Sequence, residues 1–102
     1  MSGAAVIKRP IRTIIIDDEP LARTRIARLL EGRDQFEIVG QFGRPREGLL
    51  ALEELEPDLV FLDIQMPGLS GVEVCRRLST QPDLARTSVV IVSGALTPAL
   101  EA

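Results

Sequence analysis

Four apolar runs alternate along the chain with segments whose apolar residues recur at helical spacing. The runs, which are expected to be strands, cover residues 11–16, 36–42, 58–63 and 88–93. Three of them contain consecutive apolar residues (14–16, 59–62 and 89–92), which is typical of strands buried on both faces. The run at 36–42 alternates only partly, with Phe36, Ile38 and Phe42 expected to point inward, and it is expected at a sheet edge. Alternation of strand and helix predicts an α/β domain with a parallel sheet and helices on both faces.

Proline, glycine and capping residues delimit the predicted helices. Helices are expected to begin at Pro20, at Pro45 and near Gly71, because proline suits the first helical position and Ser70 stands at capping-box spacing from Glu73. The residues expected to face the core are Leu21, Ala22, Ile26, Leu29, Leu30, Leu49, Leu50, Leu52, Leu55, Val74, Cys75 and Leu78. The arginines expected on a solvated face of the first helix are Arg23, Arg25 and Arg28. A fourth helix is expected to start at Thr97 and Pro98.

Acidic residues directly follow two of the buried strands. Asp17 and Asp18 follow the first strand, and Asp63 ends the third. Parallel α/β sheets bind ligands beyond the carboxyl ends of their strands, at the switch point in strand order, so we expect these acids to converge there. Three carboxylates in one crevice predict either a raised pKa or a bound cation. Ser93, which ends the fourth strand, places a hydroxyl donor at the same edge.

The residue types present in the chain limit the reactions and metal sites that it can support. The chain has no histidine and a single cysteine, Cys75, which excludes histidine-dependent hydrolysis, an internal disulfide and a zinc cluster. Oxygen ligands alone favour Mg²⁺, and a carboxylate beside Mg²⁺ can attack phosphorus to form an acyl phosphate. A net charge of −3 gives no nucleic-acid signal, and no apolar stretch approaches the ~20 residues of a membrane span. We therefore expect one small cytoplasmic domain that binds neither nucleic acid nor membrane.

Each of these residues also has a plain structural interpretation. Asp17 and Asp18 could simply cap the helix that follows, and Asp63 could cap the turn after its strand. Ser93 could be an ordinary turn residue. The single residues leave these alternatives open, whereas their joint occurrence at strand ends favours a functional site.

Two segments resemble a known family. The sequences IDDEPLAR (residues 16–23) and LDIQMPGLSG (residues 62–71) are similar to the receiver domains of two-component response regulators, and closest to receivers that precede LytTR-type DNA-binding domains. The resemblance covers residues 11–102 and leaves residues 1–10 as a leader. It implies a flavodoxin-like (CheY-like) doubly wound sheet with strand order 2-1-3-4. The domain would be a phosphoacceptor rather than an enzyme, limited to self-catalysed phosphorylation and dephosphorylation.

The resemblance also assigns roles to the acids. Asp63 would accept a phosphoryl group from a histidine kinase or phosphotransfer protein. Mg²⁺ would be held by Asp18 directly, by Asp17 mainly through water, by Asp63, and by the backbone carbonyl of Gln65. The Gln65 side chain would lie near the phosphate. Ser93 would be the hydroxyl that turns toward the phosphate.

The match is incomplete near the end of the chain. Gly94 fits the small residue that leaves room for the phosphoryl group, but the family's fifth strand and helix are expected to be absent. Its phosphate-pairing lysine has no counterpart, because Lys8 is the only lysine and precedes the first strand. Phosphorylation is then expected to be slower, or less tightly coupled to conformational change. Residues 89–92 would form an exposed edge, so we expect a homo-oligomer through the fourth strand and fourth-helix region, or a partner that supplies a strand.

Two alternative functions also agree with part of the sequence. A degenerate receiver could act as a dimerisation or kinase-docking module without efficient phosphotransfer; the absent lysine favours it and the intact acids oppose it. A phosphatase of the haloacid dehalogenase type also uses a strand-end aspartate with Mg²⁺, but it needs an acid where this chain has Gln65. Flavin binding is disfavoured, because the first loop is acidic, whereas a loop that binds a flavin phosphate would be rich in Gly, Ser and Thr.

Overall fold

Strands and helices alternate along the part of the chain that the structure describes. The computed structural model describes residues 9–68, 71–80 and 86–92. Its elements are β1 (Ile11–Ile16), α2 (Pro20–Leu30), β2 (Phe36–Phe42), α3 (Pro45–Leu55), β3 (Leu59–Asp63), α4 (Gly71–Thr80) and β4 (Ser88–Val92). The predicted alternation is confirmed, and β3 begins at Leu59 rather than at Asp58. The predictions that lie outside the described residues concern Ser70, the side chain of Cys75, Ser93, Gly94, the helix at Thr97–Pro98 and most of the leader.

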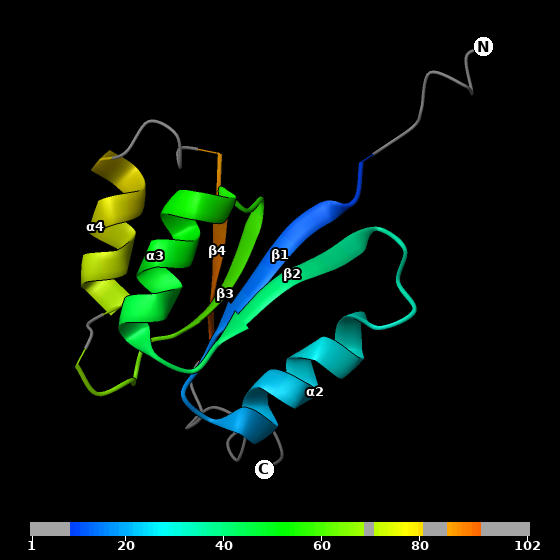
Figure 1. The fold of residues 1–102 in the computed structure, drawn as a ribbon, viewed down its shortest axis with the longest axis horizontal. Coiled ribbons are helices and arrows are strands. Elements are labelled where there is room, and N and C mark those ends of the chain that lie inside the picture. Colours follow the sequence, from blue (N-terminus) through cyan, green and yellow to red (C-terminus); the bar gives the residue numbers. More distant parts are fainter. Residues whose placement is uncertain (1–8, 69–70, 81–85, 93–102) are drawn as a thin grey trace.

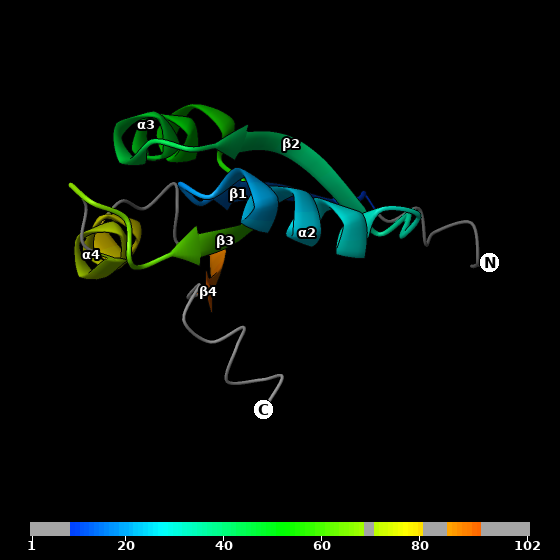
Figure 2. The same cartoon turned by 90° about the horizontal axis from the view of Figure 1, so that it is seen from below.

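The four strands form one parallel sheet in the order β2-β1-β3-β4, as predicted. Helices α3 and α4 lie together on one side of this sheet and α2 lies on the other (Figures 1 and 2). Because all strands run in the same direction, their carboxyl ends open at a single edge, where the loops into the helices begin. In the described part of the chain, β2 and β4 are the outer strands.

The core lies between the sheet and the α3–α4 layer. Its buried apolar residues are Ile14, Ile16, Ala51, Leu52, Val60, Leu62, Met66, Val74 and Leu78. Gly48 allows α3 to approach β1 closely, since a Cβ atom at that position would lie 2.8 Å from Cγ2 of Ile16. This packing holds the carboxyl ends of β1 and β3 in a rigid frame.

Both long helices face the sheet differently from the prediction. In α2 the leucines Leu21 and Leu29 are 73% and 65% exposed, and no residue of the helix is fully buried. The half-buried residues of α2 are Ala22, Arg23, Ile26, Ala27 and Leu30, a pattern in which residue 23 and its neighbours at i+3, i+4 and i+7 share one face. In α3 the exposed leucine is Leu50, at 54%. Arg23 therefore belongs to the inward face rather than to a solvated one.

A register shift corrects the prediction for β2. The pairing of β1 with β2 slips between Thr13 and Ile14, so that Ile38 pairs with Thr13 whereas Phe42 pairs with Ile16. Strand residues alternate between faces, and the extra residue at the shift reverses that alternation. Phe42 thus packs against the α3–α4 core, while Ile38 faces the α2 side.

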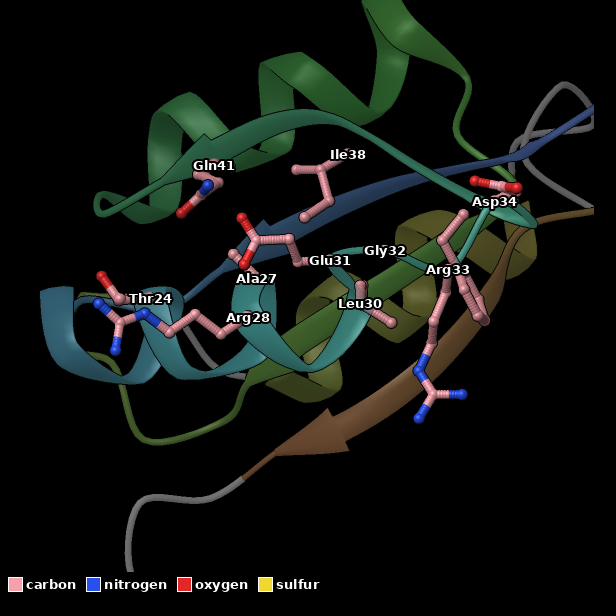
Figure 3. Close-up of a pocket in the computed structure, with 11 residues that line it drawn as sticks. Thr24, Ala27, Arg28, Leu30, Glu31, Gly32, Arg33, Asp34, Ile38 and Gln41 are labelled. Atoms are coloured by element: carbon pink, nitrogen blue, oxygen red, sulfur yellow. The ribbon is translucent and has the colours of Figure 1, made fainter.

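A cavity of about 590 Å³ lies between α2 and β2 (Figure 3). Ile38 and Gln41 line it from β2, and Thr24, Ala27 and Arg28 line it from α2. The cavity lies on the side of the sheet that α2 covers, and none of the side chains of α2 is fully buried. None of the strand-end acids lines it, so this hollow is separate from the candidate site.

Candidate metal centre

Three carboxylates converge at the carboxyl edge of the sheet. The strands β1 and β3 are neighbours in register, with Ile16 opposite Leu62, so the residues that follow them lie side by side. Carboxylate oxygens of Asp17, Asp18 and Asp63 all lie within 4.8 Å of one another. Asp17 and Asp63 are 2% and 6% exposed, whereas Asp18 is open to solvent. The site therefore has two buried acids, Asp17 and Asp63, and one acid that is exposed to solvent, Asp18.

Asp17 is held by hydrogen bonds at its backbone and at its side chain. Its amide donates to the carbonyl of Phe42 at 3.0 Å, and its Oδ1 accepts the amide of Glu19 at 2.9 Å. Its carbonyl accepts a hydrogen bond from Nη1 of Arg23 at 2.6 Å. The N-cap residue of α2 is Glu19, whose side chain makes no capping bond. Helix capping therefore does not explain the pair of aspartates.

Asp63 is anchored by the turn that follows it. Its Oδ1 accepts the amide of Gln65 at 2.8 Å, which is the Asx-turn geometry that a structural role alone would require. The turn then continues through Met66, which is 4% exposed and packs into the core, and Gly68, whose φ of +87° suits glycine. The turn needs only one carboxylate oxygen of Asp63. The structural and the chemical roles of this residue are therefore compatible.

The pKa of Asp63 is raised above its ordinary value of 3.8. Burial is the largest cause, because it removes water from the charged form. The hydrogen bond from the Gln65 amide acts in the opposite direction and is outweighed. The negative charges of Asp17 and Asp18, together with a hydrogen bond to the Asp18 side chain, further favour the protonated form. A cation bound between the three carboxylates would instead favour the ionised form of Asp63.

We predict that this raised pKa makes the metal-free protein less stable as pH increases. The folded state holds the Asp63 proton more tightly than the unfolded state, so the stabilisation is complete below pH 3.8 and is lost as pH rises through the folded-state pKa. Asp63→Asn, whose Oδ1 can still accept the Gln65 amide, should therefore be more stable than the wild type at neutral pH. Urea midpoints measured by circular dichroism in the presence of EDTA should show this difference shrinking toward pH 3.8. A difference that did not vary with pH would contradict the prediction.

The donor set of this site consists of carboxylate oxygens. Asp17, Asp18 and Asp63 approach one another closely enough to share an ion. Hard oxygen donors select Mg²⁺ or Ca²⁺ over softer metals, and partial exposure at Asp18 suits an ion that keeps several waters. The residues present thus fit a Mg²⁺-sized hard cation. The backbone carbonyl of Gln65, predicted as a further ligand, belongs to the turn that Asp63 anchors.

Arg23 is the contributor to this site that the sequence prediction missed. It was assigned to a solvated face, whereas its guanidinium reaches the Asp17 carbonyl. A signal was available, because the spacing of Arg23 to Ile26, Ala27 and Leu30 is that of one helical face.

Comparisons with known proteins identify the family. The family model of the response regulator receiver domain matches residues 13–101. The chain belongs to this family. Among curated relatives, the receiver is 46% identical to the transcriptional regulatory protein BtsR of Salmonella typhi over 70% of its own length and 30% of BtsR. It is 39% identical to the response regulator GacA of Pseudomonas viridiflava, over 79% of its own length and 38% of GacA.

A solved structure agrees with the fold. The response regulator domain of Thermotoga maritima CheB superimposes with a TM-score of 0.70 at 28% identity, covering 91% of the receiver and 72% of that domain. The prediction of a flavodoxin-like receiver of two-component systems is confirmed, and the degenerate alternative gains no support. The closer resemblance to receivers that precede LytTR-type domains stays a prediction.

The receiver matches only part of its curated relatives, spanning about a third of their length. Receiver domains of this family are phosphoacceptors that bind Mg²⁺ at an acidic pocket and interact with histidine kinases or phosphotransfer proteins. Among the described residues, none of the helices combines the length and apolarity needed to cross a bilayer.

Proposed function

We propose that this receiver accepts a phosphoryl group on Asp63 from a histidine kinase or a phosphotransfer protein. The observation that carries the proposal is the convergence of Asp63 with Asp17 and Asp18 within 4.8 Å at the carboxyl edge of the sheet. Asp63 is the acid that ends β3, and a carboxylate at that position has one oxygen engaged by the Gln65 amide and needs only the other for chemistry. The domain then acts as a phosphoacceptor, with self-catalysed phosphorylation and dephosphorylation as its whole chemistry.

Asp17, Asp18, Asp63 and the Gln65 carbonyl would hold Mg²⁺ in this proposal. The ion would neutralise charge on the transferring phosphoryl group. The residues of the chain provide the frame: the hydrogen bonds of Asp17 fix the first loop, and the Asx-turn at Asp63 fixes the second. Asp18, exposed and next to the buried pair, is the acid that an arriving ion meets first.

The transfer step is a single displacement at phosphorus. An oxygen of the ionised Asp63 forms a bond to phosphorus as the phosphorus–nitrogen bond of the donor phosphohistidine breaks, and the electron pair of that bond stays with the imidazole nitrogen. The product is an acyl phosphate on Asp63. Ser93 is proposed as the hydroxyl that donates to the phosphoryl group, Gly94 as the residue that leaves it room, and the Gln65 side chain as its neighbour.

The direct test is phosphorylation by a small donor. The receiver is incubated with acetyl phosphate and Mg²⁺, and the modified residue is located by peptide mass spectrometry after rapid acid quenching. One phosphoryl group on Asp63 is the expected result, and omission of Mg²⁺ should suppress it. An unmodified protein, or modification at another residue, would overturn the proposal.

A homo-oligomer through β4 is the second part of the proposal. Strand β4 pairs with β3 along one side only in the described part of the chain, and its Val90 and Ile91 are 42% and 43% exposed. An apolar outer strand offers unpaired backbone groups to another chain. The region of the predicted fourth helix lies next along the chain and is included in the proposed contact.

Two single variants, each with lysine in place of an exposed valine, check the oligomer prediction. Val90→Lys places a charge on the β4 edge and is expected to weaken self-association at least ~10-fold, or about 1.4 kcal/mol. Val72→Lys, on the exposed surface of α4 where Val72 is 69% exposed, is the matched control and should associate like the wild type. Sedimentation velocity over a concentration series measures both. A wild-type protein that stays monomeric throughout, or equal effects of the two lysines, would contradict the contact.

Three further expectations from the sequence remain proposals. The receiver domain is taken to span residues 11–102 after a leader of ten residues, and its location is taken to be cytoplasmic. Its net charge of −3 carries no basic excess, which supports output through protein contacts rather than through direct nucleic-acid binding.

A further inference from the structure

Arg23 connects three segments that meet behind the acidic site. It belongs to α2, it donates to the carbonyl of Asp17 in the loop after β1, and its guanidinium lies against Gly43 in the loop after β2. The space at Gly43 is limited, since a Cβ atom built there would come within 2.7 Å of Nη1 of Arg23. The guanidinium therefore occupies space that is available because residue 43 has no Cβ atom.

The hydrogen bond from Arg23 complements the other bonds to Asp17. The Asp17 amide is tied to Phe42 of β2, and Oδ1 of Asp17 accepts the amide of Glu19. The carbonyl is the remaining backbone polar group of this residue, and Arg23 donates a charge-assisted hydrogen bond to it, the stronger kind. Rotation of the peptide group that joins Asp17 to Asp18 would break this bond and would alter the backbone from which the Asp18 side chain projects.

We propose that Arg23 is a positioning residue that holds the Asp17–Asp18 loop in the geometry needed for cation binding. This inference rests on the Mg²⁺ site of the proposed function. Outer-shell groups of this kind orient the ligands of a metal, and their loss typically reduces metal affinity 10- to 100-fold. Arg23 acts from the β2 side of the site, through the peptide of Asp17, and makes no contact of its own with the phosphoryl group.

The sign of the effect separates positioning from simple electrostatics. A guanidinium close to a cation site repels the cation, so removing its charge alone would tighten Mg²⁺ binding. Loss of positioning would weaken it. Arg23→Gln is expected to weaken Mg²⁺ binding roughly 10-fold. Arg25→Gln removes the same charge from an exposed position on the same helix and is expected to leave the affinity within about twofold of the wild type.

A second variant leaves Arg23 itself unchanged. Gly43→Ala introduces the Cβ atom that would meet the guanidinium, and the flexible tip of Arg23 can yield only by moving away. Gly43 does not have a positive φ, so alanine is tolerated by its backbone. The expected result is a loss of Mg²⁺ affinity in the same direction as for Arg23→Gln.

The experiment has two readouts on the full chain. Mg²⁺ affinity is measured by isothermal titration calorimetry, and amide exchange of Glu19 is measured by NMR in the metal-free protein. In Arg23→Gln and Gly43→Ala the Glu19 amide should exchange faster, while amides of β3 keep their protection and show that the fold is intact. Arg25→Gln should behave like the wild type in both readouts.

The outcomes distinguish this inference from the proposed function. Unchanged or tighter Mg²⁺ binding by Arg23→Gln, or a loss equal to that of Arg25→Gln, would overturn the role of Arg23 while the metal site stands. A wild-type protein that binds no Mg²⁺ would overturn the metal site. Unaltered Glu19 exchange in both variants would then overturn the role of Arg23 as well.

Discussion

Asp63→Asn is expected to abolish phosphoryl transfer to this receiver, reducing incorporation from acetyl phosphate to the level of a blank. The reason is chemical: asparagine keeps the size of the side chain and the acceptor for the Gln65 amide, but its amide lacks a nucleophilic oxyanion. The fold and the turn should therefore survive while the chemistry is lost. Intact-mass spectrometry after quenching, with hydroxylamine treatment to cleave any acyl phosphate, measures the result.

A matched acid on the surface provides the control for this experiment. Asp34 is exposed, lies in the segment between α2 and β2, and lines the cavity of Figure 3 rather than the acidic site. Asp34→Asn should be phosphorylated like the wild type. If Asp63→Asn still gained a phosphoryl group, at Asp18 or elsewhere, Asp63 would not be the acceptor.

Asp18→Asn is expected to weaken Mg²⁺ binding at least ~10-fold, since loss of a ligand should cost no less than loss of an outer-shell partner. Asp18 is the exposed member of the triad, and its oxygens lie within 4.8 Å of those of Asp17 and Asp63. Its removal relieves repulsion in the metal-free protein, so the unfolding midpoint in EDTA should be unchanged or higher. Calorimetric titration with Mg²⁺ measures the affinity, and circular dichroism follows the midpoint.

The neighbouring acid tests whether this effect is local. Glu19 is also exposed, carries the same charge and makes no capping bond to α2. Glu19→Gln is expected to change Mg²⁺ affinity by about twofold or less, because a solvated charge outside the triad is screened. Equal losses in the two variants would show that general negative charge, rather than a ligand, attracts the ion.

The two loops of the site are built on a common plan. In each, an aspartate at a strand end accepts the amide of the residue two positions on, through Oδ1: Glu19 for Asp17 and Gln65 for Asp63. Each Asx-turn orients its carboxylate through Oδ1 alone. The energetic consequence is visible at Asp63, where burial and neighbouring charge raise the pKa more than the Gln65 amide lowers it. Burial and neighbouring charge thus disfavour the ionised form of Asp63 in the metal-free protein, and a bound cation would favour it.

Several features of this receiver could be predicted from the sequence, because local chemistry decides them. Proline at residues 20 and 45 marks the first helical position of α2 and α3, since its ring restricts φ and its missing N–H is not needed there. Strand–helix alternation implies a parallel sheet, and parallel strands bring their carboxyl ends to one edge. That geometry places Asp17, Asp18 and Asp63 at one edge, and the pairing of β1 with β3 brings their oxygens within 4.8 Å of one another.

Other features were decided only by the tertiary structure. Periodicity shows that α2 has an apolar side, but the rotation at which the helix docks against the sheet determines which residues are covered. That rotation leaves Leu21 and Leu29 exposed and turns Arg23 inward. The register shift at Thr13 depends in the same way on how two strands pair, and it sends Ile38 and Phe42 to opposite faces.

The acids of this receiver could be predicted from the sequence, whereas the contacts of Arg23 behind them could not. Asp17, Asp18 and Asp63 are set by their own strands, whose direction and length the chain specifies locally. The position of Arg23 depends on contacts with the loops after β1 and β2, which lie apart in sequence and meet only when the sheet has formed. Sequence alone therefore determined which carboxylates gather at the sheet edge. Packing between distant segments decided what holds them in place, because helical spacing indicates the face on which Arg23 lies but not the two loops that it contacts.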